Sequence, residues 1–120
     1  MDSEIKGNLS KYFYSGTFFS IITTIIDTFT TYIGINNGAY ETNRAMLLFF
    51  TMFGVEKGLL AYMIGMFNLC LMCCGAYHLS LKEEGKTAHY LSFLLVFSIW
   101  FVSFPRMMVA INNVSILLKV

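Results

Sequence analysis

The fold of this chain is decided by residues 12–35, which read YFYSGTFFSIITTIIDTFTTYIGI. About 20 apolar residues in a helix, each rising ~1.5 Å, are enough to cross a hydrocarbon core of ~30 Å. Tyr12, Tyr14 and Tyr32 stand toward the two ends of the stretch, where amphipathic rings favour the membrane interfaces. The residues that follow, 36–38, are Asn-Asn-Gly and have turn chemistry. We therefore predict a membrane-spanning helix over about residues 12–35.

Two more apolar stretches, about 58–81 and 88–112, are long enough to span a bilayer. The charged residues 82–86 between them form a short turn, which predicts that these two spans are antiparallel neighbours. The apolar part of residues 44–53 is too short to span and predicts an interfacial or re-entrant helix. The expected fold class is all-α: a single transmembrane domain over residues 1–120, with about three transmembrane helices and one short helix.

The composition excludes several classes of protein. Apolar residues make up 57% of the chain and charged residues 12%, whereas a typical soluble domain carries about 25% charged residues. The net charge of +1 offers no electrostatic footprint for nucleic acid. The lipid bilayer is therefore the expected surrounding, and the cell membrane is the expected location. Basic residues divide almost evenly between the two sides, with a slight lean toward a cytoplasmic N-terminus.

Pro105 interrupts the last apolar stretch and leaves two interpretations open. The helix either kinks there and continues to about residue 112, or it ends. We favour continuation, because residues 88–104 alone are marginal for a span. Arg106 is then expected near the membrane side opposite the N-terminus. Asn112 and Asn113 either form hydrogen bonds between helices or mark the exit from the membrane.

Asp27 is the most informative residue for function, because an ionisable group inside a span is costly and normally faces the bundle. Ser20, Thr24, Thr31 and Gly34 share its helical spacing and predict one polar stripe of small residues. The simpler interpretation is that this stripe packs helices together. The functional interpretation is a buried polar site for a proton, a cation or a small ligand.

Polar residues also bracket the short helix: Glu41, Asn43, Arg44, Glu56 and Lys57. If that helix folds back, Lys57 or Arg44 could neutralise Asp27 or Glu41; otherwise all five lie among the lipid headgroups. The candidate polar intramembrane site accordingly comprises Asp27, Thr24, Thr31, Glu41, Asn43 and Lys57.

The run from Ile26 to Gly34, followed by Gly38 and by residues 41–43, resembles an uncharacterised family of small prokaryotic membrane proteins. That family carries an Asp and a Thr near the end of its first span, then Glu-x-Asn-Pro in the next loop and a Lys at the start of the next long span. Arg44 stands where the family has Pro, so the sequence departs from the family's pattern in this loop. The resemblance implies a fold and a polar site but no reaction.

The cysteines Cys70, Cys73 and Cys74 and the nearby His78 are spaced so that Cys70, Cys74 and His78 can share one side of a helix. Thiolate and imidazole suit copper or zinc, but buried cysteines usually behave as small hydrophobic residues. We predict no metal site and no cofactor, and we keep these three residues as the alternative.

No phosphate-binding loop, paired-carboxylate spacing or nucleophile motif appears, so the sequence predicts no enzymatic activity. The favoured hypothesis is a structural or accessory subunit that packs against copies of itself or against other membrane subunits. The first alternative is a small transporter or channel for protons, cations or solutes that uses Asp27. The second is a membrane metal or redox protein.

Overall fold

The computed structural model describes residues 3–38 and 44–119, and these residues form an all-α bundle. Its four helices are α1 (Ser3–Asn36), α2 (Arg44–Phe53), α3 (Val55–Lys82) and α4 (Lys86–Leu118). The helices α1, α3 and α4 are each long and apolar enough to cross a membrane. The predicted fold class is confirmed, and the chain is an integral membrane protein.

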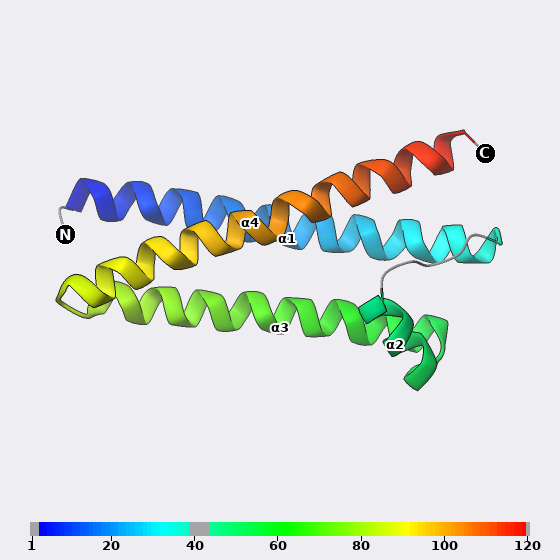
Figure 1. Cartoon of the computed structure of the whole chain (residues 1–120), viewed down its shortest axis with the longest axis horizontal. Coiled ribbons are helices and arrows are strands. Elements are labelled where there is room, and N and C mark those ends of the chain that lie inside the picture. The colour runs from blue at the N-terminus through cyan, green and yellow to red at the C-terminus, as the bar shows by residue number, and fades with distance from the viewer. Residues whose placement is uncertain (1–2, 39–43, 120) are drawn as a thin grey trace.

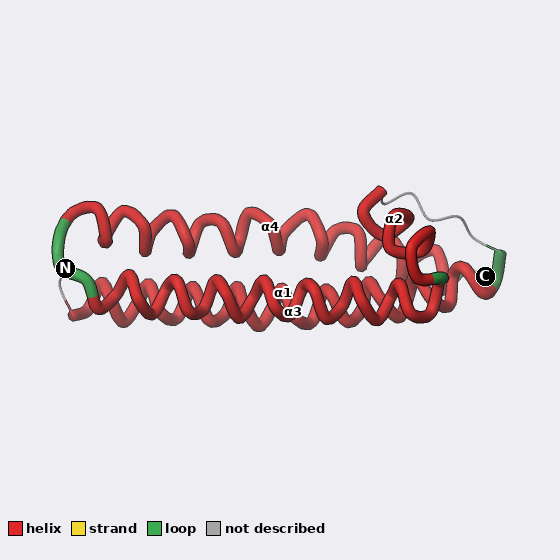
Figure 2. Tube along the Cα trace, turned by 90° about the horizontal axis from the view of Figure 1, so that it is seen from below, coloured by secondary structure: helices red, strands yellow, loops and turns green. Residues whose placement is uncertain are grey.

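The three long helices form two layers. α1 and α4 run in the same direction and α3 runs against them, and α4 crosses over α1 near the middle of the bundle (Figure 1). Seen at right angles, α1 and α3 lie in one layer and most of α4 lies in the other (Figure 2). All three pairs of long helices are in contact, and the molecule measures 53 × 30 × 16 Å.

The crossing of α1 and α4 depends on Gly16. A Cβ atom at this position would lie 2.8 Å from Cγ2 of Ile99 and 3.0 Å from Nε1 of Trp100. Trp100 Nε1 donates a hydrogen bond to the Tyr12 carbonyl at 2.8 Å, and Ser103 Oγ donates to the Gly16 carbonyl at 3.3 Å. Small residues and interhelical hydrogen bonds of this kind are what hold helices together in lipid.

The end of the bundle that holds the α3–α4 turn has an aromatic core. Phe13 of α1 stacks on Tyr77 of α3 with ring centroids 4.2 Å apart, and Ile99 of α4 completes the buried cluster. Next to it, the hydroxyls of Ser80 and Ser92 are 2.8 Å apart across α3 and α4. These contacts fix the antiparallel pairing that the short charged turn predicts.

The short helix α2 packs on α3, and among the described helices it contacts no other. Gly54, with φ +84°, makes the bend between them, and a Cβ on Gly58 would lie 2.9 Å from the Phe49 carbonyl oxygen. Met46 of α2 is fully buried against Leu59 and Tyr62. α2 therefore folds back against the start of α3 and does not insert between the long helices.

Two helices extend beyond the limits that hydropathy predicts. α4 continues through Pro105 to Leu118, so the interpretation in which the helix ends at the proline is wrong. α1 begins at Ser3 instead of near residue 12. A helix of 34 residues is ~51 Å long, more than the hydrocarbon core requires, so its polar first turns extend past the membrane interior.

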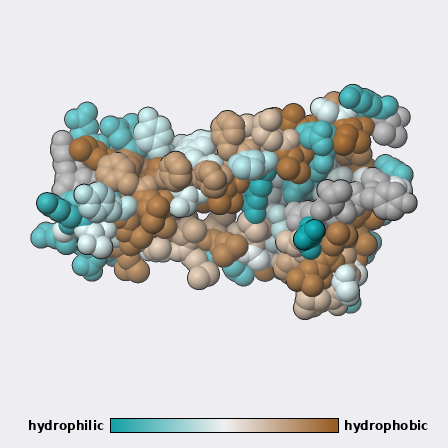
Figure 3. All heavy atoms as spheres, in the orientation of Figure 1, coloured by the Kyte–Doolittle hydropathy of each residue, from teal (hydrophilic) through white to brown (hydrophobic). Residues whose placement is uncertain are grey.

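The outer surface of the long helices is apolar. Hydrophobic residues dominate the middle of the face shown in Figure 3, and hydrophilic residues gather toward its ends. Large side chains such as Phe18, Leu71, Phe97 and Phe101 are each more than 60% exposed. Such a surface is suited to contact with lipid.

Candidate functional site

A polar layer lies between α1 and α4. Ser20, Thr24, Asp27 and Thr31 are all buried, with exposed fractions of 2%, 2%, 7% and 7%. Their helical spacing places them on the face of α1 that meets the other long helices. The predicted polar stripe therefore faces the interior of the bundle and not lipid.

The layer lies deep in the membrane. Thr24 is 13 residues after Lys11 and 12 residues before Asn36, which is ~20 Å and ~18 Å along the helix. Asp27 lies about one turn closer to Asn36. Both residues therefore lie well inside a hydrocarbon core of ~30 Å, where polar groups need partners within the protein.

Asp27 is bound from α4 by Asn113. The Asn113 amide Nδ2 donates to Asp27 Oδ1 at 3.1 Å and to Thr30 Oγ1 at 3.3 Å. Of the two roles left open for this asparagine, the structure shows the hydrogen bond between helices. Asn113 thus ties the carboxyl group of α1 to the C-terminal half of α4.

Arg106 is the second ionisable group of the layer, and sequence reasoning missed it. Its guanidinium donates to Thr24 Oγ1 at 3.1 Å and reaches Met66 Sδ of α3 at 2.8 Å. The expectation that Arg106 lies near the far membrane surface is wrong, because α4 remains helical through Pro105 and turns the side chain inward. The available signal was the spacing of Ser103, Arg106 and Asn113 along one face of α4.

Three threonine hydroxyls on this side of α1 bond to their own helix. Thr23 and Thr24 donate to the Ser20 carbonyl at 3.0 Å and 2.8 Å, and Thr28 donates to the Thr24 carbonyl at 2.7 Å. Among the residues that the structure describes, every buried side-chain nitrogen or oxygen has a hydrogen-bond partner. Asp27, Arg106 and Thr24 of the layer therefore all have partners within the protein.

The other members of the predicted site are not gathered around Asp27. Glu41 and Asn43 lie outside the described residues. Lys57 is exposed in the first turn of α3, and Arg44 is exposed at the start of α2. The structure thus brings Thr24 and Thr31 onto the face of Asp27, and it leaves Lys57 at the end of the bundle.

The three residues of the metal-site alternative, Cys70, Cys74 and His78, each make a different contact. Cys70 Sγ lies 3.9 Å from Ser20 Oγ, His78 Nε2 bonds to the Tyr14 hydroxyl, and Cys74 packs beside the aromatic core. Within residues 3–38 and 44–119, no group of three or more His, Cys, Asp or Glu side chains is arranged to hold a metal ion.

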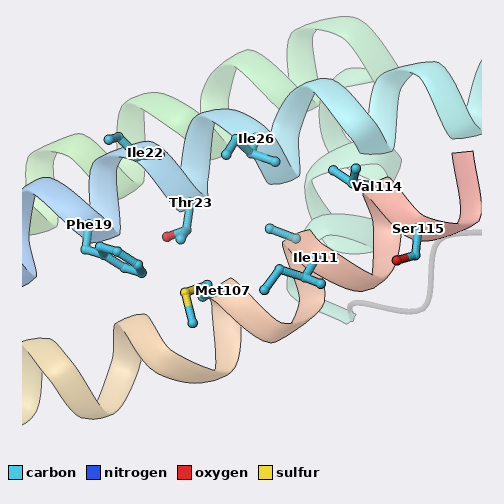
Figure 4. A pocket seen from close by; sticks show the side chains of 9 residues that line it. Phe19, Ile22, Thr23, Ile26, Met107, Ile111, Val114 and Ser115 are labelled. Atoms are coloured by element: carbon cyan, nitrogen blue, oxygen red, sulfur yellow. The ribbon is translucent and has the colours of Figure 1, made fainter. Parts of the chain in front are cut away.

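A hollow of about 370 Å³ lies between α1 and α4, beside the polar layer (Figure 4). Its walls are mainly apolar, with Phe19 and Ile26 on α1 and Met107 and Ile111 on α4. The hydroxyl of Thr23, one of its few polar groups, already donates to the Ser20 carbonyl. The hollow is suited to a hydrocarbon chain and has few groups that could bind a polar ligand.

Comparison with known proteins gave no match to a family model, a curated protein or a solved structure. The resemblance to the small prokaryotic membrane family therefore stays a prediction.

Proposed function

We propose that this chain is a structural or accessory subunit that packs in the cell membrane with copies of itself or with other membrane proteins. The resemblance noted above supports a prokaryotic cell membrane, and the distribution of basic residues supports a cytoplasmic N-terminus. No catalytic activity is proposed.

The observation that carries this proposal is the pairing of the ionisable groups of the polar layer within the protein. Asp27 accepts from Asn113, Arg106 donates to Thr24, and the hydroxyls of Thr24 and Thr28 bond to their own helix. Polar groups arranged in this way hold helices together. The outward faces of the same helices are apolar and available to neighbours in the membrane.

The test is native extraction of the full chain with a mild detergent, followed by affinity purification and mass determination. Stoichiometric self-assembly, or a stoichiometric membrane protein that co-purifies, is the expected result. A lone monomer without partners, at protein-to-detergent ratios that preserve known membrane complexes, would contradict the proposal.

A second candidate function is transport of a proton or a small ion. The observation in its favour is that a carboxyl group and a guanidinium, Asp27 and Arg106, both lie in the membrane interior, where ionisable groups often mark a conduction path. The test is flux into liposomes that contain the purified chain, with Asp27→Asn as the variant and Glu84→Gln, in the exposed turn between α3 and α4, as the control. Flux that is absent, or that is unchanged in Asp27→Asn, removes this function.

A further inference from the structure

The face of α3 that points away from the bundle has an unusual composition. The buried residues Leu59, Tyr62, Cys70 and Tyr77 mark its inner face. The opposite face carries a series spaced by four, three, four and three residues: Ala61, Gly65, Asn68, Met72 and Gly75. This spacing keeps the series on one side of the helix. We call these five residues the outer face of α3.

Asn68 is the polar member of the outer face, and it is exposed. It lies 11 residues after Lys57 and 14 residues before Lys82, which is ~17 Å and ~21 Å along the helix and so near the middle of the bilayer. In the part of the chain that the structure describes, its amide makes no hydrogen bond. An amide in hydrocarbon without a partner is costly, so the position of Asn68 favours a partner from another chain.

The two glycines of the outer face leave room for that partner. A Cβ atom added at Gly65 or at Gly75 would meet nothing within 4 Å. These glycines lie one turn before Asn68 and two turns after it. Another helix can therefore approach the α3 backbone closely on both sides of the amide, as small residues allow in membrane helix pairs.

We propose that the outer face of α3 is a dimer interface for a second copy of this chain in the same orientation, with Asn68 bonded to Asn68 of the other copy. This inference deepens the proposed subunit function and rests on it. Copies inserted in one orientation place this amide at the same depth. An amide both donates and accepts, so two copies related by a two-fold axis satisfy each other. Lipid headgroups do not reach this depth, which argues against a lipid partner.

The first experiment measures dimerisation of the full chain by analytical ultracentrifugation in mild detergent. Asn68→Leu is expected to raise the dimer dissociation constant roughly 5- to 30-fold, the effect of losing an interhelical amide contact in a membrane. Asn8→Leu makes the same change at an exposed position in the first turns of α1, outside the membrane interior, and is expected to leave the constant unchanged. Circular dichroism checks that both variants remain helical.

The second experiment locates the interface by disulfide cross-linking in membranes. In a chain whose three native cysteines are replaced by alanine, Ala61→Cys is expected to cross-link two copies. Leu60→Cys is the control, because Leu60 is 53% exposed but lies about 100° around the helix from Ala61. Efficient cross-linking at residue 60 and none at residue 61 would overturn the proposed face.

The outcomes distinguish a failure of the proposed interface from a failure of the proposed subunit function. A dimer that weakens in Asn68→Leu and not in Asn8→Leu supports both. An oligomer that is unchanged in Asn68→Leu overturns the interface and leaves the subunit function standing. A wild-type chain that is monomeric but bound to a different membrane protein overturns the second copy as partner. A monomer with no partner overturns both.

Discussion

The link between Asn113 and Asp27 gives the sharpest prediction about stability. Asn113→Ala removes one amide nitrogen that is shared by Asp27 Oδ1 at 3.1 Å and Thr30 Oγ1 at 3.3 Å. Polar contacts between membrane helices average ~0.6 kcal/mol and reach ~1.7 kcal/mol. Two contacts therefore predict a loss of about 1–3 kcal/mol in the free energy of unfolding, or roughly 5- to 150-fold in the unfolding equilibrium constant.

The assay is reversible unfolding of the purified chain in mixed micelles with increasing sodium dodecyl sulfate, followed by circular dichroism. Asn112→Ala is the matched control, because residue 112 is exposed on the same helix and the same gain in helix propensity applies to both variants. The difference between the two variants isolates the contacts with α1. Equal stability of Asn113→Ala and Asn112→Ala would refute the argument that this asparagine holds α4 against α1.

Three further predictions concern the helix contacts; those for Gly16 and Thr24 use the same unfolding assay, and the one for Gly58 uses limited proteolysis. Gly16→Ala is expected to lower the free energy of unfolding by about 1–3 kcal/mol, because the added methyl group collides at the α1–α4 crossing. Gly7→Ala is the control: its methyl group enters open space and should be neutral or slightly stabilising. Equal effects of the two substitutions would argue against a tight crossing. Gly58→Ala should loosen α2 and raise its proteolysis, and unchanged proteolysis would contradict the close approach of α2 to α3. Thr24→Val removes the hydroxyl that accepts from Arg106 and should lower the free energy of unfolding by about 1 kcal/mol. Thr24→Ser keeps a hydroxyl and should retain most of that stability. A serine variant less stable than the valine variant would be inconsistent with this hydrogen bond.

The fold could be predicted from the sequence because hydropathy and length act on each helix separately. The stretches around residues 12–35 and 58–81 needed no knowledge of their neighbours, and the short helix at residues 44–53 followed from its length. The inward face of α1 was predictable for the same reason: the spacing of Ser20, Thr24 and Asp27 is a property of one helix.

The partners of Asp27 could not be predicted, because they depend on how α4 is rotated and shifted against α1. Lys57 and Arg44 were plausible counter-charges by sequence, but the packing places both on the surface at one end. The inward position of Arg106 was not predicted, because the preceding Pro105 left open whether the helix continues. Neighbouring groups can compensate for the hydrogen bond that a proline removes from a membrane helix, and a helix that continues puts Arg106 one turn beyond Ser103, facing the bundle.

Because Trp100 donates a hydrogen bond to the Tyr12 carbonyl, it is an intrinsic fluorescence probe of the contact between α1 and α4. Trp100 is the single tryptophan of the chain, and its indole lies at the α1–α4 crossing with its ring centroid 5.9 Å from that of Phe19. Its ultraviolet emission therefore reports on one helix pair, without a dye and without background from other indoles. Separation of α4 from α1 would change the emission spectrum even where the overall helix content stayed constant.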